Sequence, residues 1–141
     1  MKQFFGCFYA PRDLKYPADG FDAPINYMGR HMLAARQIAA DGGAMAMAVG
    51  RPRNAAALKE ALSQDGLHLS GDSTGALVLA CYRRWAEDYP RHLEGVVVSA
   101  VIDQDSRTLI LSRDAMGCLP LFYAHQGGCV AFADHPAKLF A

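Results

Sequence analysis

The sequence lacks long apolar runs and an excess of charge of either sign. No stretch of its 141 residues holds the roughly 18 consecutive apolar side chains that a membrane-spanning helix needs. Fourteen Lys and Arg residues balance fourteen Asp and Glu residues. A neutral chain has no general attraction for nucleic acid or for an anionic membrane. We therefore expect no nucleic-acid partner and no membrane partner.

Cysteine is scarce and follows no metal or disulfide pattern. The four cysteines stand at positions 7, 81, 118 and 129 without a C-x-x-C pair, and the five histidines include no i, i+4 pair. A zinc site needs closer ligand pairs, and a disulfide framework needs a denser, smaller chain. Residues 1–6 hold one cation and a very short apolar patch, too little for a signal peptide. These absences predict no metal site, reduced thiols and a cytoplasmic protein.

What the chain does contain is a globular composition, with 52% apolar and 20% charged residues. A chain of 141 residues has the length of one ordinary domain and can bury a real core. No internal repeat or low-complexity tract divides it. We therefore expect a single domain over residues 1–141.

The first third of the chain mixes apolar segments with turn formers. Residues 4–9 are apolar and aromatic, which predicts a short buried strand. Residues 11–24 carry three prolines and an Asp-Gly pair, which predicts an irregular loop. Residues 28–39 place methionine and alanine at helical spacing, so we expect a short helix that ends at Asp41-Gly42-Gly43. Residues 44–49 alternate alanine and methionine between glycines, which favours a buried strand.

Two helices are expected next. Asn54 can cap the first through its side-chain oxygen, Asp72 or Ser73 can cap the second, and Pro90 should end it. The buried stripes of the two helices are predicted to be Leu58, Ala61 and Leu62, and Leu77, Cys81 and Trp85.

The last third has the pattern of two β-hairpins. Residues 95–103 and 107–113 form one predicted pair, and residues 121–124 and 129–133 form the other across a Gln-Gly-Gly turn. Helices followed by a block of hairpins indicate an α+β fold with mostly antiparallel sheets.

Residues 95–140 carry a more specific pattern. They read G-VVVSAVID-QDSRTLILSRDAMGCLPLFYAHQGGCVAFADHPAKLF. This resembles the glutaminase domain of asparagine synthetases, whose pattern is G-x-F-A-F-A-x-x-D, then L-x-L-x-R-D-x-x-G-x-x-P-L-Y-Y, then F-A-S-E-x-K-A-L. The matching residues are Arg113, Asp114, Gly117, Pro120, Leu121, Tyr123, Phe132, Ala133 and Lys138.

The resemblance extends upstream to about residue 44. Tyr82 and Trp85 match the family's helical Y-x-x-W, and Gly50 with residues 54–58 matches the segment after its N-G pair. The resemblance implies an αββα sandwich of the type found in N-terminal-nucleophile hydrolases. Because the family's domain continues several tens of residues further, the sandwich is expected to be truncated at its C-terminus.

The residue types in the best-matched motif predict structural roles. Gly117 can adopt a turn conformation barred to other residues, and Pro120 fixes the entry to the next strand. Arg113 and Asp114 are adjacent, so in a strand they point to opposite faces and should anchor different neighbours. With Tyr123, these residues are expected to hold the fold together rather than to catalyse.

The nucleophile that the resemblance implies is missing from its usual place. The family uses a cysteine as the first residue, whose thiolate attacks the glutamine amide while its α-amine accepts a proton. Here position 2 is Lys2, and the nearest cysteine is Cys7. Cys7 is expected to be a buried core thiol. The alternative is an active glutaminase in which removal of residues 1–6 makes Cys7 the first residue.

Two further departures concern substrate binding. The family's N-G pair, which supplies two donors to the oxyanion, corresponds to Val49-Gly50, and Val49 has no side-chain donor. The family's substrate-anchoring Asp stands eight residues before the helical Tyr, a place held here by Thr74, with Asp72 two residues away. Gly50, Asp72 and Thr74 are thus the candidate substrate-binding residues, and three departures argue for a glutaminase domain without glutamine hydrolysis.

The remaining expectations concern partners. No S-G-G-x-D-S phosphate loop is present, so ATP and Mg²⁺ are expected only on a synthetase domain that this chain lacks. The sequence resembles the degenerate glutaminase domains of β-lactam synthetases and lasso-peptide cyclases, on the evidence of residues 50–54. We expect docking to an ATP-dependent synthetase domain or subunit, and a homodimer through an unpaired edge. The other alternative is a free-standing protein-binding module.

Overall fold

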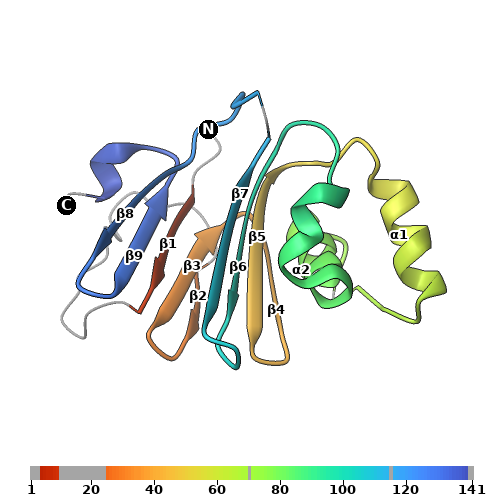
Figure 1. Ribbon diagram of the computed structural model, residues 1–141, viewed down its shortest axis with the longest axis horizontal. Helices are drawn as coiled ribbons and strands as arrows, with labels where there is room; N and C mark the ends of the chain where they lie inside the picture. Colours follow the sequence, from red (N-terminus) through yellow and green to blue (C-terminus); the bar gives the residue numbers. More distant parts are fainter. Residues whose placement is uncertain (1–3, 10–24, 70, 115, 140–141) are drawn as a thin grey trace.

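Two antiparallel sheets stack face to face in the computed structural model (Figure 1). The structure describes residues 4–9, 25–69, 71–114 and 116–139. Sheet A has the strand order β2-β3-β1-β9-β8, and sheet B has the order β4-β5-β6-β7. Every strand pairing within the two sheets is antiparallel. The two-sheet α+β sandwich that the sequence predicted is confirmed.

The strands are short, as expected for a domain of this size. Sheet A consists of β1 (Phe4–Phe8), β2 (Ile25–Met28), β3 (His31–Ala35), β8 (Phe122–Gln126) and β9 (Cys129–Ala133). Sheet B consists of β4 (Gln37–Asp41), β5 (Ala44–Gly50), β6 (Val97–Asp103) and β7 (Thr108–Arg113). The helical segments are α1 (Ala55–Gln64), α2 (Thr74–Trp85), and the 3-10 turns η1 (Ala86–His92) and η2 (Pro136–Leu139).

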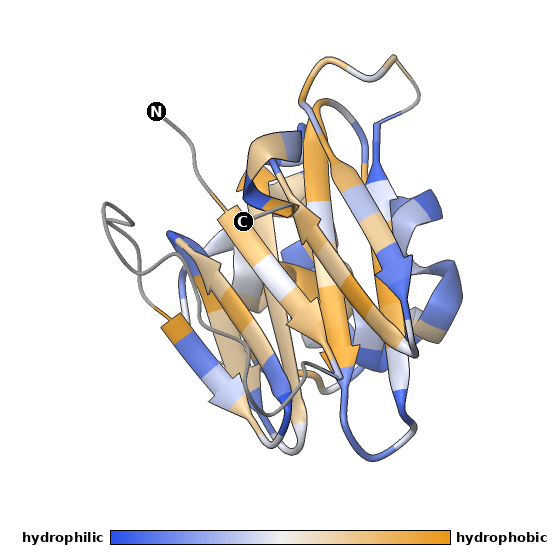
Figure 2. Ribbon diagram, turned by 90° about the vertical axis from the view of Figure 1, so that its left-hand side faces the viewer, coloured by the Kyte–Doolittle hydropathy of each residue, from blue (hydrophilic) through white to orange (hydrophobic). Residues whose placement is uncertain are grey.

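The alternating residues of β5 explain the two main cores. Its alanines at positions 44, 46 and 48 pack under the helices, whereas Met45, Met47 and Val49 lie between the sheets. Small residues on the helix side let α2 approach the sheet closely, and the longer methionines fill the space between the sheets. A third, smaller cluster on the outer face of sheet A includes Phe5 and Cys7, with Leu139 of η2 packed on it. Figure 2 views that face, where the central strands are coloured as hydrophobic.

Helix α2 packs on sheet B and approaches its backbone closely at Gly75. A Cβ atom added to Gly75 would lie 2.4 Å from the backbone oxygen of Gln37, so only glycine permits this approach. The side chain of Ser73 caps the helix by accepting a hydrogen bond from the Ala76 N–H at 3.1 Å. At the other end of the helix, Tyr82 donates a hydrogen bond to Asp103 of β6 at 2.6 Å. The Gly75 contact fixes the start of α2 against the start of β4, and the Tyr82 hydrogen bond ties the last part of the helix to β6.

The helix predicted over residues 28–39 is wrong. The segment instead forms β2, β3 and β4, with Asp41 to Ala44 as a tight turn between β4 and β5. All five residues of β3 are buried, so no polar alternation marks this strand in the sequence. Alanine and methionine are good helix formers, but here packing between two neighbouring strands outweighs their intrinsic preference.

Smaller differences concern the helix ends. Asn54 precedes α1 but does not cap it; its side chain instead donates to the His92 carbonyl and accepts from the Glu94 N–H. Pro90 does not end α2, because it lies inside η1. The helix ends where Ala86 adopts a positive φ of 52°. Ala61 is only partly buried, and the strand predicted from residue 95 begins at Val97.

Most strand predictions are confirmed. β1, β5 and both hairpins lie where the sequence placed them, within one or two residues at most ends. Gly127 and Gly128 both have positive φ angles and join β8 to β9, as a two-residue hairpin turn requires. The loop predicted over residues 11–24 lies outside the described residues.

His31 ties β1 to β3 and makes the stability of the fold depend on pH. Its Nδ1 accepts a hydrogen bond from the Tyr9 N–H at 3.1 Å, and its ring stacks on Phe8. Burial, with the nearby Arg30 charge as a smaller cause, lowers the pKa of His31 from its ordinary value of 6.5. The unfolded chain therefore binds the proton more readily than the folded chain.

We expect the stability contributed by neutral His31 to be fully present above pH 6.5 and to be lost as the pH falls through 6.5 toward its lower folded pKa. Urea unfolding at pH 7.5 and at pH 5.5 measures this loss. A His31→Asn variant should show a smaller difference between the two pH values, whereas the exposed His68→Gln control should match the parent. An equal pH dependence in the parent and in His31→Asn would contradict the assignment.

Candidate functional site

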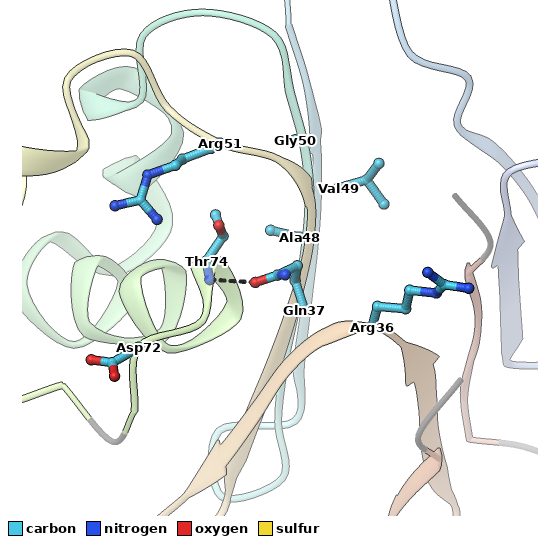
Figure 3. A pocket seen from close by; sticks show the side chains of 8 residues that line it. All are labelled: Arg36, Gln37, Ala48, Val49, Gly50, Arg51, Asp72 and Thr74. Atoms are coloured by element: carbon cyan, nitrogen blue, oxygen red, sulfur yellow. Dashed lines mark hydrogen bonds between the residues drawn. The ribbon is translucent and has the colours of Figure 1, made fainter. Parts of the chain in front are cut away.

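A cavity of about 500 Å³ opens where the start of β4, the end of β5 and the start of α2 meet (Figure 3). The predicted substrate-binding residues Gly50, Asp72 and Thr74 all line it. The other described lining residues are Arg36, Gln37, Ala48, Val49 and Arg51. Three segments that are distant in sequence thus meet in a single concave site.

The start of α2 forms one wall of this cavity. Thr74 is buried, and its N–H donates a hydrogen bond to Oε1 of Gln37 at 2.8 Å, drawn in Figure 3. The Ser73 hydroxyl oxygen accepts a hydrogen bond from the Ala76 N–H. Two of the amides that a helix start leaves unpaired are therefore bonded to side chains of this chain. The Gln37 amide oxygen occupies the position at the helix start that an incoming acceptor group would seek.

The charges around the cavity favour an anionic group. The described lining residues include two guanidinium groups, of Arg36 and Arg51, and one carboxylate, that of Asp72. The start of α2 adds a partial positive charge of about half an elementary charge. In Figure 3, Arg51 lies on the α2 side of the strands and Arg36 on the opposite side with Val49. The two cations thus flank the strand ends instead of forming one cluster.

The Val49-Gly50 pair lies at the end of β5, beside β6. Val49 is part of the apolar core between the sheets and offers no hydrogen-bond donor to the cavity. Gly50 has a φ of 86°, and an added Cβ would lie 2.4 Å from the Val96 carbonyl oxygen. The backbone conformation at Gly50 therefore requires glycine, whereas the side chain before it makes only apolar contacts.

No nucleophile of the expected kind faces the cavity among the described residues. Cys7 lies in the middle of β1, buried on the outer face of sheet A, and is not a lining residue. Burial, followed by the contact with Cys129, raises the pKa of the Cys7 thiol to about 12. Thr74 is the sole hydroxyl-bearing residue in the described lining, which holds neither histidine nor lysine to activate it. The described lining therefore has groups that can bind a ligand, and it has no cysteine to attack one.

The residues of the best-matched motif lie away from the cavity, in the connection from β7 to β8. Asp114 accepts a hydrogen bond from the Cys118 N–H at 3.1 Å, and its own carbonyl accepts from the Gly117 N–H at 3.0 Å. The hydrogen bond from the Cys118 amide is the largest cause that lowers the pKa of the Asp114 carboxyl. Gly117 has a positive φ of 64°. Pro120 and Tyr123 follow, the latter on the edge strand β8.

Sequence reasoning missed Arg36, Gln37 and Arg51 as lining residues. The first two stand at the bend between β3 and β4, a segment that the sequence predicted as a helix. Arg51 belongs to the segment 50–54 that supported the subgroup resemblance, but no role of its own was predicted for it. The Arg36-Gln37 pair, which interrupts the apolar residues around it, is the one signal that could have indicated a break between two elements there.

Two observations concern other kinds of site. Within the described ranges, no three His, Cys, Asp or Glu side chains lie close enough together to hold a metal ion. None of the helices in that same part of the chain has the length and apolar character to cross a membrane.

Comparison with known proteins identifies the domain. Residues 34–141 match the family model described as a glutamine amidotransferase domain. Asparagine synthetase [glutamine-hydrolyzing] 3 of Bacillus subtilis (strain 168) is 29% identical over 92 residues, which are 65% of this chain and 15% of that protein. A putative asparagine synthetase [glutamine-hydrolyzing] of Mycobacterium bovis is 33% identical over 75 residues, which are 53% of this chain and 12% of that protein. The chain thus spans less than a sixth of the length of these curated relatives.

A solved structure supports the same assignment at the level of the fold. The glutamine phosphoribosylpyrophosphate amidotransferase of B. subtilis, complexed with ADP and GMP, superposes with a TM-score of 0.63 at 15% identity. The alignment covers 79% of this chain and 29% of that one. The fold is therefore a two-sheet α+β sandwich like that of this amidotransferase, and in the described part of the chain α1 and α2 cover sheet B while the outer face of sheet A carries only η2. The family match covers more than half of the sequence, so this chain belongs to the glutamine amidotransferase domain family, in the form that stands at the N-terminus of asparagine-synthetase-like proteins.

Proposed function

We propose that this domain does not hydrolyse glutamine and serves as a structural and docking domain for an ATP-dependent, amide-forming synthetase. The observation that carries the proposal is the composition of the cavity. Its described lining offers two guanidinium groups, a carboxylate and a helix start, but no thiol, and Val49 has no donor at the position where the family has an Asn side chain. Such a site can bind a small polar ligand and cannot attack its amide.

The magnitude of the expected loss supports this reading. Removal of one oxyanion donor lowers the rate of acyl transfer by about 100- to 1,000-fold, and Val49 stands where the family has such a donor. A missing nucleophile removes the covalent route altogether. The described cavity residues supply no substitute, because Thr74 has no adjacent base among them. The two losses act on the same step and together leave no rate enhancement to measure.

The synthetase part is proposed to supply the chemistry. Its ATP and Mg²⁺ would activate a carboxylate, and the amine would come from ammonia or from the acceptor molecule itself. An acceptor with its own amine, as in a macrolactam- or β-lactam-forming reaction, needs no glutamine. The amidotransferase fold then serves the assembly rather than the nitrogen supply, in the cytoplasm.

The choice of nitrogen source tests this proposal in a protein that contains both this domain and its synthetase part. Amide product should form with ammonium salt or with an amine-bearing acceptor, and replacing these with glutamine should lower product formation by at least about 100-fold, the loss attached to one oxyanion donor. Product formation that is equally fast with glutamine as the sole nitrogen source would overturn the proposal.

The docking half of the proposal rests on an exposed apolar strip around β8. Tyr123 is 68% exposed and Phe122 is 41% exposed on the edge strand β8, and Met116, in the connection that precedes β8, is 85% exposed. An open sheet edge with exposed apolar side chains is a surface that proteins usually cover. In the curated relatives the matched segment is 12–15% of a much longer chain, and the proposed cover is the synthetase part of such a chain.

A matched pair of variants tests the docking surface. Tyr123→Ser should weaken co-purification of the domain with the synthetase part about tenfold or more, because an exposed aromatic anchor is lost. Tyr27→Ser is the control, since Tyr27 is 61% exposed on β2, at the opposite edge of the same sheet. Equal effects of both variants would contradict the assignment. Light scattering of the domain alone shows whether a second copy covers the strip as a homodimer instead.

A further inference from the structure

Two of the four cysteines form a thiol pair on the outer face of sheet A. The Sγ atoms of Cys7 and Cys129 lie 3.4 Å apart, although 122 positions separate the residues in sequence. Both belong to the small apolar cluster on that face, which Figure 2 views directly. The pair lies on neighbouring strands and not on a loop, so strand pairing itself holds the two sulfur atoms together.

The register of the two strands explains the contact. Cys7 of β1 stands opposite Ala131 of β9, and Cys129 lies two residues before Ala131, on the same face of the sheet. Cys129 is the first residue of β9, next to the Gly127-Gly128 turn, and is partly exposed. Cys7 is buried in the central strand of the sheet. Cys129 is therefore the partly exposed member of the pair, and Cys7 is the buried member in contact with it.

The other cysteines provide a contrast within the same chain. Cys118 is exposed in the connection from β7 to β8, and Cys81 is buried in the core under the helices. In the described part of the chain, the sulfur-to-sulfur contact of Cys7 with Cys129 has no counterpart at Cys118 or Cys81. Cys118 is thus an accessible single thiol, and Cys129 is an accessible thiol with a neighbour.

We propose that Cys7 and Cys129 are a dithiol site that a low-molecular-weight disulfide, such as oxidised glutathione, converts into a cross-strand disulfide. The Cys129 thiolate attacks one sulfur of oxidised glutathione, whose disulfide breaks and releases one glutathione thiolate. Cys7 then loses its proton to solvent and attacks the Cys129 sulfur, which releases the second glutathione. Two protein thiols are oxidised to one disulfide, and one oxidised glutathione is reduced to two thiols.

The order of the two attacks follows from the environment of each thiol. Burial raises the pKa of Cys7 to about 12, so its thiolate is rare at neutral pH. The partly exposed Cys129 therefore meets the reagent first. Once Cys129 carries glutathione, the second attack is intramolecular and starts from sulfur atoms already in contact, which compensates for the scarcity of the Cys7 thiolate. A disulfide needs the sulfur atoms to approach from 3.4 Å to about 2.05 Å.

The bond would fasten the central strand of sheet A to β9. It would close a long loop of the unfolded chain and so lower the entropy of the unfolded state. The oxidised protein should therefore unfold at a higher temperature than the reduced protein, and a thiol reductant should restore the original value. This property is separate from glutamine chemistry, because the pair lies on the face of sheet A that is directed away from sheet B and its cavity residues.

Mass spectrometry of the native, folded domain tests the proposal. After incubation with oxidised glutathione at pH 8, peptide mapping should show Cys7 joined to Cys129 with the loss of two hydrogens, and one glutathione held at Cys118. Cys118 serves as the internal control for reagent access. In a Cys7→Ser variant, Cys129 should instead retain a stable glutathione adduct. Cys129→Ser should leave Cys7 unmodified.

If either serine variant fails to fold, the peptide map of the wild-type protein is sufficient to test the proposal. Glutathione retained at Cys129 beside a free Cys7 would overturn the proposal. So would a Cys118 that reacts while both members of the pair stay unmodified.

Discussion

A chain that begins at Cys7 should be unfolded and should release no glutamate from glutamine. Removing residues 1–6 would take Phe4, Phe5 and Gly6 from the central strand of sheet A. Phe4 is 1% exposed and Phe5 is 5% exposed. Loss of one buried phenylalanine side chain costs about 3–5 kcal/mol, so two of them approach the whole stability of a typical domain, about 5–15 kcal/mol. Far-UV circular dichroism and a glutamate assay measure the two outcomes.

This truncation tests the alternative in which processing exposes Cys7 as the nucleophile. That alternative needs a folded domain with Cys7 at its start and near a substrate. Cys7 is instead paired with Met32 of β3 on one side and Ala131 of β9 on the other. A folded truncated chain whose turnover disappears in its Cys7→Ala variant would establish the alternative and end our proposal.

Gly6→Ala should destabilise the domain by more than about 3 kcal/mol, beyond the usual range of about 1–3 kcal/mol for overpacking. A Cβ added to Gly6 would lie 2.0 Å from Cζ of Phe132, in the core between the sheets. The Phe132 ring is fully buried, so it cannot swing into solvent to make room. Urea unfolding measures the change in the free energy of unfolding.

Gly71→Ala provides the matched control for this substitution. An added Cβ at Gly71 meets nothing within 4 Å, so its free energy of unfolding should stay within about 0.5 kcal/mol of the parent. Combining Gly6→Ala with Phe132→Leu should recover part of the loss, because the smaller side chain vacates the contested space. A Gly6→Ala domain as stable as the Gly71→Ala control would show that the sheets are not packed this closely.

The fold was predictable in segments whose own residues show a strand periodicity or the residue types of a tight turn. The second hairpin follows from two glycines with positive φ, and β5 follows from alternation between flanking glycines. The helix predicted over residues 28–39 failed because alanine and methionine suit either structure and because β3 is buried on both faces. Such a strand is decided by its neighbours in the sheet, which a single sequence does not display.

The residues of the candidate site were also predictable only in part. Gly50, Asp72 and Thr74 were found through the family resemblance, and the structure gathers them at one cavity. Gln37 was not found, since its hydrogen bond to the start of α2 depends on how the helix lies on β4. Arg36 was hidden by the same error in secondary structure. The residue types of the site were visible in the sequence, but the contacts between elements that are distant in sequence were not.

The central claim is that this amidotransferase fold has no glutaminase activity, and glutamate release by the purified domain tests it most directly. The sample should be the intact chain, with its mass measured, incubated with glutamine and assayed for glutamate. We predict glutamate formation no faster than in glutamine alone. Enzyme-dependent release that a cavity variant such as Thr74→Val abolishes would contradict the account.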